Sequence, residues 1–496
     1  MGPTLRSNDQ RASRTKATVI GLGVVLAVFL LPVRADFLKP VIPMEEGSVL
    51  VYPERVLAGA IPNKDFETMY GPGNLWFLAG VYRVFGVTVG VERTVGSLYR
   101  LALVLALFVI GRRYGLAVGI AAALIATLLT VGTWGVAYAW FGGLALAAWS
   151  LVAKTGRRYL FLGGIAGGLA LVFRPDLVLV IAALVLIGRS RRFTLGVLAG
   201  SLLYIPLFVL AGPRAVIEGT IVDPIFRINP GRRFPIPWAS PLLWLVLGST
   251  AVLAYSAWVS HRRSKDTSLL ACAWFSAALL PYALQRADDF HLASAGCVSV
   301  ALMPAALTVL LDEERRRLAV PIACLIVVAS SWGSALRGTM ESVGQAIGVG
   351  DPPSYPLTFN GRTVPVPLKS QVDQLSGLLS AVEGSTEPGD RIFVGPSDLS
   401  NTVYNDTFLY NLVPELTPAT YFLEMNPGTA DRPGSRLKSD VSTADVIVVT
   451  TRYDDWGSPT PQDQDSVEGS IDLNGLCTSG TFGPWRLYVR CTEGKG

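Results

Sequence analysis

The sequence predicts a polytopic α-helical membrane protein with a C-terminal α/β domain outside the membrane. Of the 496 residues, 51% are hydrophobic and only 16% are charged, which is too apolar for an ordinary soluble protein. The apolar residues gather in long runs before residue 333, whereas residues 334–496 have the composition of a soluble domain. The chain therefore divides into a membrane part and a separately folded C-terminal part.

The apolar runs define the membrane part. A spanning helix needs roughly 20 residues, and several runs are shorter, so we expect about eleven spans, some of them tilted, flanked by snorkelling arginines or shielded by neighbours. The runs lie near residues 17–33, 95–110, 116–131, 141–153, 159–173, 177–187, 193–210, 242–259, 268–282, 292–311 and 318–332.

Basic clusters between these runs predict the orientation. If the N-terminal segment "RSNDQRASRTK" is cytoplasmic, "GRRYG", "KTGRR", "GRSRRF", "SHRRSKD" and "DEERRR" are cytoplasmic as well, as the positive-inside rule expects. Counting residues 74–90 as a further span would reverse the side of the Arg112–Arg113 cluster, so this stretch is interpreted as an interfacial helix or a shielded half-span. A cleaved signal peptide is not favoured, because no small-residue cleavage site precedes the first polar loop.

The predicted domains follow from this topology. Residues 1–16 form a basic cytoplasmic N-terminus, and residues 17–333 form the transmembrane domain, with a first outer loop at 34–90. Residues 334–496 are expected to form an extracytoplasmic domain, in which "GDRIFVGPSDL" and "ADVIVVTTRYDDW" predict strands followed by loops. "VPLKSQVDQLSGLLSAVEG" predicts an amphipathic helix and "WRLYVRC" a last strand, so the domain is expected to be α/β.

The cysteines and the charges restrict the chemistry further. Cys477 and Cys491 lie in the outer domain, where the redox environment permits a disulfide between them. Only two histidines are present, which excludes a His-rich metal site. The net charge of +5 is spread over the membrane-flanking clusters, so nucleic acid is not expected as a partner.

The first candidate site is a pair of adjacent carboxylates, Glu45 and Glu46, in "MEEGSVLVYPERVL". The spacing of apolar residues predicts a short amphipathic helix at the membrane surface. A partly desolvated carboxylate there is a better general base. The alternative is that both glutamates only stabilise the N-terminus of the helix.

The second candidate is the corner "FRPD", in which Pro175 ends one apolar helix and the next begins at once. Arg174 has the fork geometry that suits a phosphate. Equally, Arg174 and Asp176 could pair with each other and serve only the corner.

The third candidate is the very short loop "QRADDFHL", which places Arg286, Asp288, Asp289 and His291 between two apolar runs. A solvated turn does not need this mixture of charges, although such a turn remains the alternative. The adjacent Asp288 and Asp289 could also bind a divalent cation, a weak indication on its own.

The fourth candidate is the pair Arg93 and Arg100, seven residues apart and hence on one face of a helix. An uncompensated arginine in the middle of the bilayer costs about 2.5–3.5 kcal/mol. Arg100 must therefore either snorkel to the interface or face a polar cavity that could hold an anionic headgroup.

Together these groups suit one class of reaction. A carboxylate at the outer face would take the proton of an acceptor hydroxyl, and the cations would stabilise the charge on a departing lipid phosphate.

Three consecutive segments resemble the GT-C superfamily of membrane glycosyltransferases, which use polyprenyl-phosphate sugars. In order, they are the first span, "EEGSVLVYPERVLAGAIPNKDFETMYGPGNLWFLAGVYRVFG" and "ERTVGSLYRLALVLALF". "GGIAGGLALVFRPDLVLVI" resembles the Gly-rich helix and basic corner of that superfamily, and "QRADDFHL" a late outer-loop motif. The resemblance covers most of the membrane half. The tail segment "YNDTFLYNLVPELTPATYFLEMNPG" also looks like that of bacterial members, but no role follows for it.

The resemblance implies a glycosyltransferase of the cell membrane, similar to the aminoarabinose transferase and protein O-mannosyltransferase group. Its donor would be a polyprenyl-phosphate sugar and its acceptor a glycan, lipid or protein of the cell envelope. The acidic pair of that family supplies the base, which maps to Glu45 or Glu46. The family's first acidic residue is usually Asp, so the choice stays open, and the frame of the interfacial helix favours Glu46.

Asp65 of "KDFE" is a secondary candidate for the base. The phosphate would be held by Arg174, Arg286 and His291, with Asp288 or Asp289 orienting sugar or cations. Two other functions are compatible with a polytopic membrane protein. A flippase of lipid-linked sugars would show an inverted repeat, which the sequence lacks, and a receptor would depend on its tail for binding.

Overall fold

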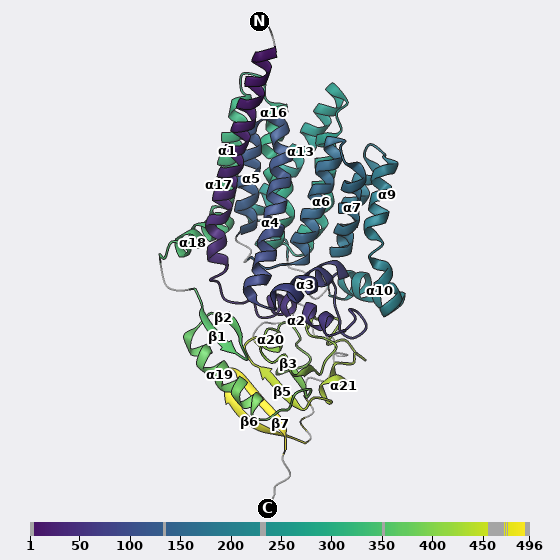
Figure 1. Cartoon of the computed structure of the whole chain (residues 1–496), viewed down its shortest axis with the longest axis vertical. Helices are drawn as coiled ribbons and strands as arrows, with labels where there is room; N and C mark the ends of the chain where they lie inside the picture. Colours follow the sequence, from purple (N-terminus) through teal and green to yellow (C-terminus); the bar gives the residue numbers. More distant parts are fainter. Residues whose placement is uncertain are drawn as a thin grey trace, which may run out of the picture.

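The computed structural model describes residues 4–131, 135–228, 235–349, 353–454, 471, 473 and 475–491. Long helices run side by side, and a sheet-containing C-terminal region lies at one end of them (Figure 1). Shorter helices, among them α2 and α3, lie across the boundary between these two parts. The bundle contains α1 (Thr4–Asp36), α4 (Val89–Gly111), α5 (Leu116–Val131), α6 (Ala139–Gly156), α7 (Leu160–Phe173), α8 (Val178–Leu186), α9 (Arg191–Ser201), α13 (Pro241–Ser264), α14 (Ser268–Gln285), α15 (Asp289–Ala301), α16 (Met303–Leu310) and α17 (Ala319–Ser331).

Each apolar run of the sequence coincides with helix in this bundle. Within the described residues, six helical stretches are long and apolar enough to cross a membrane by themselves. They are Thr15–Asp36, Val89–Tyr114, Arg191–Ala211, Pro241–Ser264, Ser268–Gln285 and Asp289–Leu310. Several of the remaining runs form shorter apolar helices, so the polytopic membrane fold is confirmed, while the number of eleven spans stays a prediction.

The boundary helices are α2 (Glu45–Leu57), α3 (Pro72–Phe85), α10 (Tyr204–Ala211), α11 (Pro213–Ile217), η3 (Glu218–Ile228) and α18 (Arg337–Ala346). The stretch 74–90, expected to differ from an ordinary span, contains most of α3, which crosses the end of the bundle instead of running along it (Figure 1).

Glycines hold α7 and α9 in close contact. Gly164 and Gly168 of α7 face Gly196 and Gly200 of α9, the small-xxx-small pattern that lets two helix backbones approach. A Cβ added at any of the four would lie 2.1–2.3 Å from a carbonyl oxygen of the other helix. This crossing fixes α7, and with it the corner at Arg174 that follows its last turn.

The C-terminal region is a mixed sheet with a helix packed on it. The strands are β1 (Tyr355–Phe359), β2 (Arg362–Val366), β3 (Arg391–Pro396), β4 (Thr417–Pro418), β5 (Val446–Thr450), β6 (Leu476–Phe482) and β7 (Trp485–Arg490). β1 and β2 form a hairpin, and the main sheet has the order β4-β3-β5-β7-β6, with β3 parallel to β4 and β5 and the other pairs antiparallel.

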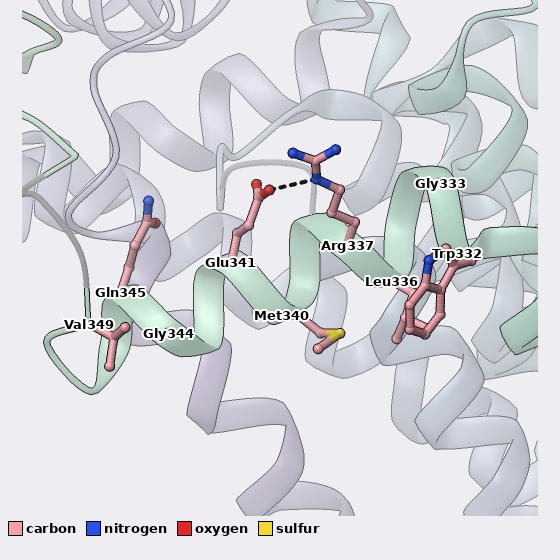
Figure 2. Close-up of a pocket in the computed structure, with 9 residues that line it drawn as sticks. All are labelled: Trp332, Gly333, Leu336, Arg337, Met340, Glu341, Gly344, Gln345 and Val349. Carbon is pink, nitrogen blue, oxygen red and sulfur yellow. Dashed lines mark hydrogen bonds and ion pairs between the residues drawn. The ribbon is translucent and has the colours of Figure 1, made fainter.

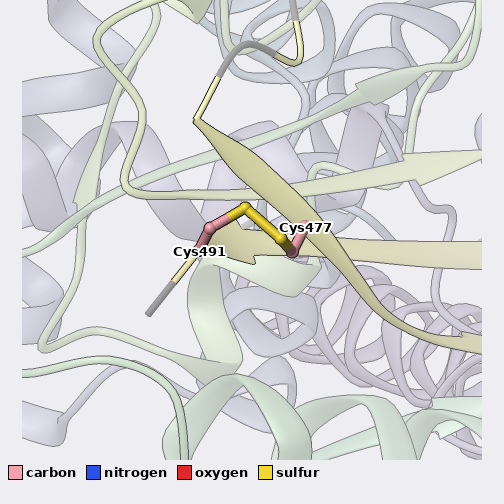
Figure 3. Close-up of a disulfide and its surroundings, with 2 residues drawn as sticks. All are labelled: Cys477 and Cys491. Atoms are coloured by element: carbon pink, nitrogen blue, oxygen red, sulfur yellow. A yellow bond between two sulfur atoms is a disulfide. The ribbon is translucent and has the colours of Figure 1, made fainter. Parts of the chain in front are cut away.

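The predicted amphipathic helix is α19 (Lys369–Glu383), which buries Leu375, Leu378 and Val382. The predicted disulfide between Cys477 and Cys491 is present and ties the start of β6 to the end of β7, with the two Cα atoms 5.0 Å apart (Figure 3).

The loop after α1 belongs to the core of this C-terminal region. Leu50, Tyr52 and Phe66 are fully buried in the same hydrophobic cluster as Phe408 and Trp485. Backbone hydrogen bonds extend the contact, from Val41 N to Pro365 O (2.7 Å) and from Phe408 N to Pro43 O (3.0 Å). An ion pair joins Glu54 of α2 to Arg362 of β2. The position of α2 is therefore set by the C-terminal region as well as by the bundle.

The α7–α9 crossing gives a first prediction. Gly168→Ala places a Cβ 2.2 Å from Val197 O and should lower stability by about 1–3 kcal/mol through overpacking. The midpoint of thermal unfolding in detergent measures this. Gly248→Ala on α13 is the matched control, because nothing lies within 4 Å of that position. Equal midpoints for the two variants would contradict the close crossing.

Candidate active site

A cavity of about 330 Å³ opens where the end of the bundle, the boundary segments and the C-terminal region meet. The bundle contributes the start of α6, the corner after α7, the end of α14 and the start of α15 to its walls. The start of α2, η3 and the loop that contains Glu424 also contribute to these walls. The side chains that line it are Glu45, Met69, Tyr70, Tyr138, Ala139, Trp140, Arg174, Asp176, Pro224, Ile225, Ile228, Tyr282, Gln285, Arg286, Asp288, Phe290, His291 and Glu424.

The two adjacent glutamates at the start of α2 point in different directions. Consecutive helical residues project about 100° apart, so only one of the pair can face the cavity. Glu45 lines it and accepts a hydrogen bond from the hydroxyl of Tyr404. Glu46 is 0% exposed and turns instead towards Arg93 of α4. Glu46, which the frame of the helix favoured as the base, therefore does not line the cavity, whereas Glu45 does.

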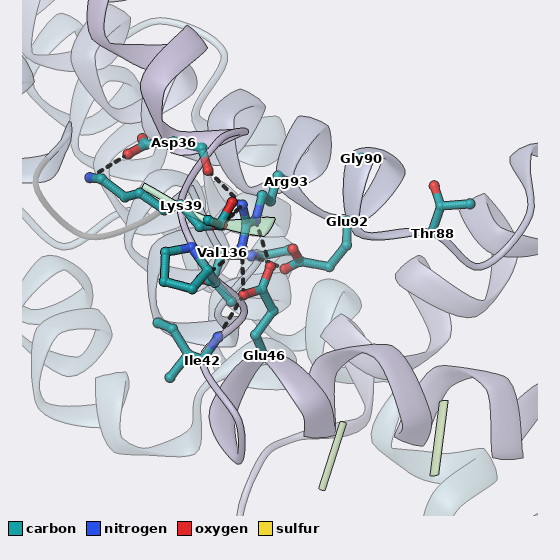
Figure 4. A network of polar contacts seen from close by, with 12 residues as sticks. Asp36, Lys39, Ile42, Glu46, Thr88, Gly90, Glu92, Arg93 and Val136 are labelled. Atoms are coloured by element: carbon teal, nitrogen blue, oxygen red, sulfur yellow. Dashed lines mark hydrogen bonds and ion pairs between the residues drawn. The ribbon is translucent and has the colours of Figure 1, made fainter. Parts of the chain in front are cut away.

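Glu46 and Arg93 form a buried two-point ion pair (Figure 4). Arg93 Nε donates to Glu46 Oε1 at 2.6 Å and Nη2 to Oε2 at 2.9 Å, while the backbone N–H of Ile42 donates to the same carboxylate at 3.0 Å. The remaining guanidinium bonds reach the carbonyl oxygens of Asp36 (2.7 Å), Lys39 (2.8 Å) and Pro40 (3.2 Å). The pair thus fastens the end of α1, the following loop and α2 to α4.

Arg100 is likewise buried and bonded to the protein backbone. It is 1% exposed, its guanidinium lies 4.0 Å from the ring centroid of Phe141, and it neither snorkels nor lines the cavity. Its hydrogen bonds go to the carbonyl oxygens of Gly96 (2.9 Å), Thr130 (3.2 Å) and Val136 (2.8 Å). Arg93 and Arg100 share one helix face, as expected, but neither lines the cavity, and both donate to backbone carbonyl oxygens.

The corner after α7 brings Arg174 into the cavity. Pro175 opens a short turn, η2 (Pro175–Leu177), and Asp176 accepts hydrogen bonds from Arg174 Nε (3.1 Å) and Nη2. Among the described residues nothing accepts from Nη1, which leaves that nitrogen for an anion. The two interpretations of this corner are compatible, because Asp176 orients the guanidinium while both side chains line the cavity.

The loop before α15 and its first turn contribute a linked set of three polar side chains. Asp288 caps the helix by accepting from His291 N (2.8 Å), and it also contacts His291 Nδ1 (2.8 Å) and Arg286 Nε (3.1 Å). Burial raises the pKa of Asp288, but the hydrogen bonds from His291 and the charge of Arg286 outweigh it and hold that pKa below its usual value. Asp289 is exposed and does not line the cavity.

Two further sequence candidates have no support as site residues. Asp65 is exposed, and its carboxylate accepts from the backbone N–H of Ile61 (2.7 Å), away from the cavity. The suggested divalent-cation site gains no support either, because the described part of the chain holds no group of three His, Cys, Asp or Glu side chains that could bind a metal ion.

An aromatic wall faces these charges and was not foreseen. Trp140 and Tyr282 stack with centroids 3.5 Å apart, and the guanidinium of Arg174 lies 5.5–5.6 Å from both rings and from Tyr70. Stacked rings beside a cation form a rigid surface that suits a sugar face or a charged headgroup. Glu424, from the tail segment without an assigned role, completes the wall and accepts from the Tyr70 hydroxyl at 3.3 Å.

A larger hollow of about 650 Å³ lies along α18 and the turn before it (Figure 2). Its charged groups are Arg337 and Glu341, which pair with each other at 2.9 Å and are both largely exposed. The other lining side chains include the exposed apolar Trp332, Met340 and Val349. This shallow groove lacks converging acids and bases, so the smaller cavity is the candidate site.

No protein-family model and no curated protein sequence matches this chain. Solved structures do match its fold. The crystal structure of ArnT from Cupriavidus metallidurans bound to undecaprenyl phosphate superposes with a TM-score of 0.55 and 13% identity, over 96% of this chain and 98% of ArnT. The chain has the fold of ArnT.

The same protein in the apo state gives a TM-score of 0.54 with 14% identity and the same coverage. An oligosaccharyltransferase from Archaeoglobus fulgidus gives a TM-score of 0.49 with 10% identity, over 94% of this chain and 73% of that one. The match to ArnT extends over both the helical bundle and the C-terminal region, and it confirms the GT-C fold expected from the sequence.

The buried Glu46–Arg93 pair yields a second prediction. Arg93→Met leaves a buried carboxylate without its partner, which should cost about 3–5 kcal/mol of stability. The thermal midpoint in detergent should fall sharply, and the double variant Arg93→Met with Glu46→Leu should recover part of the loss, because the Glu46 carboxylate is no longer buried without its partner.

Arg214→Met is the matched control, since the Arg214 side chain is 88% exposed and its pairing with Glu218 is expected to contribute no more than about 1 kcal/mol. An Arg93→Met midpoint equal to that of the control would show that the pair does not hold α2.

Proposed function

We propose that this protein transfers a sugar from a polyprenyl-phosphate donor to an acceptor hydroxyl at the extracytoplasmic end of the membrane bundle, with Glu45 as the general base. One observation carries the proposal: in a fold like that of ArnT, a single cavity brings Glu45 together with Arg174, Arg286 and His291. The ArnT structure contains undecaprenyl phosphate, which supports a lipid phosphate as the ligand here.

The reaction follows from the charges around the cavity. Glu45 takes the proton of the acceptor hydroxyl, and the acceptor oxygen forms a bond to the anomeric carbon of the sugar. The bond between that carbon and the phosphate oxygen breaks, and the electron pair leaves with the polyprenyl phosphate. An inverting transfer needs the base and the phosphate on opposite sides of the sugar. The cavity suits this requirement, because its carboxylate and its cations are separate groups.

The cations stabilise the leaving group. Arg174 and Arg286 are each oriented by an aspartate, Asp176 and Asp288 respectively, so their geometry is fixed before the donor binds. Preorganised donors of this kind are worth most where negative charge develops in the transition state. His291, whose Nδ1 is held by Asp288, lines the same cavity.

The position of the cavity also suits the partners. It lies at the sheet-bearing end of the bundle, and a polyprenyl chain could remain in the bilayer while its phosphate reaches Arg174. The basic clusters of the sequence favour an extracytoplasmic location for that end. An acceptor glycan, lipid or protein of the cell envelope would then approach from the side of the C-terminal domain. A flippase would need polar access from both ends of the bundle.

The third prediction concerns the base. Glu45→Gln removes the proton acceptor while keeping its shape, and should lower kcat by roughly 10²–10⁴-fold. The assay follows the release of polyprenyl phosphate from a panel of polyprenyl-phosphate sugars in proteoliposomes with envelope acceptors. Asp65→Asn serves as the control, because the exposed Asp65 lies away from the cavity and its loss should leave kcat within about twofold. Full activity of Glu45→Gln would remove Glu45 as the base.

A further inference from the structure

On the proposed transferase function, we infer that Tyr404 of the C-terminal domain is a positioning residue that orients the carboxylate of Glu45 for proton transfer. The domain would then act in the chemical step itself, in addition to any part it has in selecting the acceptor. The inference rests on the contact between these two side chains and on the way each is held in place.

The Tyr404 hydroxyl donates a hydrogen bond to Glu45 Oε2. Burial, and the negative charge of Glu45 after it, raise the pKa of the Tyr404 phenol well above its usual value, so this group stays a donor at neutral pH. One oxygen of Glu45 is therefore held by the phenol. The bond fixes the rotamer of the carboxylate and leaves Oε1 for the acceptor proton.

A hydrogen-bond network inside the C-terminal domain holds Tyr404. Its ring packs edge-on against Tyr453, with centroids 4.8 Å apart. The hydroxyl of Tyr453 donates to Asp406 Oδ1 at 2.8 Å. Asp406 is 0% exposed and also accepts from Arg452 Nη1 (2.8 Å) and Trp485 Nε1 (2.7 Å). A satisfied buried carboxylate of this kind makes the surrounding segment rigid.

The same segment is pressed against the start of α2. Phe408 N donates to Pro43 O at 3.0 Å, and a Cβ added to Gly47 would lie 2.4 Å from Phe408 N. Only glycine allows this approach of the two backbones. Since Glu45 lies two residues before Gly47 and Tyr404 four before Phe408, the docking sets the distance between their side chains.

The fourth prediction tests this role. Tyr404→Phe removes one hydrogen bond to a charged group and should lower kcat by about 10- to 100-fold, with the KM for the lipid donor unchanged within about twofold. Tyr421→Phe is the matched control, because the Tyr421 hydroxyl also joins the C-terminal domain to the first loop, donating to Asn63 O at 3.1 Å. Its kcat should stay near that of the wild type.

A double-mutant cycle separates positioning from folding. Glu45→Asp keeps a carboxylate but withdraws it from Tyr404 by one methylene, so adding Tyr404→Phe should cost less than about twofold further. An equal loss in both backgrounds, or a wild-type kcat for Tyr404→Phe beside an inactive Glu45→Gln, would overturn the inference and leave the proposed function standing. Full activity of Glu45→Gln would instead overturn the base assignment, and the role of Tyr404 with it.

Discussion

The buried ion pair between Glu46 and Arg93 is the constraint on which the rest of the site depends. It joins the first residues of α2 to α4 and, through the carbonyl oxygens that Arg93 also binds, to the end of α1. Because a buried pair tolerates little displacement without leaving a charge unpaired, the start of α2 has one position. That position turns the neighbouring Glu45 towards the cavity. Of the two adjacent carboxylates, Glu46 holds the backbone in place and Glu45 lines the cavity.

The site is composite, and no single part of the chain contains it. The bundle supplies Arg174, Arg286 and His291 from two tight corners, and the first loop supplies Glu45. The C-terminal region supplies Glu424 and the phenol that contacts Glu45. The first loop and the C-terminal region share a hydrophobic core, so their relative position is set by packing as well as by polar contacts. A sheet-containing domain that is merely tethered to the bundle would not need this common core.

Hydropathy predicted the fold class because each apolar run must become a helix in the bilayer, where no water satisfies the backbone. The positions of the basic clusters likewise indicated that residues 74–90 are not an ordinary span. The soluble composition of the tail indicated the α/β region. The sequence also identified Glu45, Arg174, Arg286 and His291 as candidates, since charges next to apolar runs are costly and few. Those signals depend only on neighbouring residues in the sequence, and in the structure all four side chains line the cavity.

The structure departs from the sequence-based expectations where long-range pairing decides the position of a side chain. Glu46 has the better frame on an amphipathic helix, but Arg93, 47 residues away, buries it. Arg93 and Arg100 look like anion ligands until the backbone carbonyls around them are known. Tyr404 and Glu424 lie in a tail segment with no pattern that links it to α2, so only the tertiary fold reveals them.

The most direct test of the account is electron cryomicroscopy of the protein in lipid nanodiscs with added polyprenyl phosphate. The account predicts density for the phosphate between Arg174 and Arg286, with Glu45 facing it across the cavity and Glu46 against Arg93; a phosphate bound elsewhere, or Glu46 turned into the cavity, would contradict it.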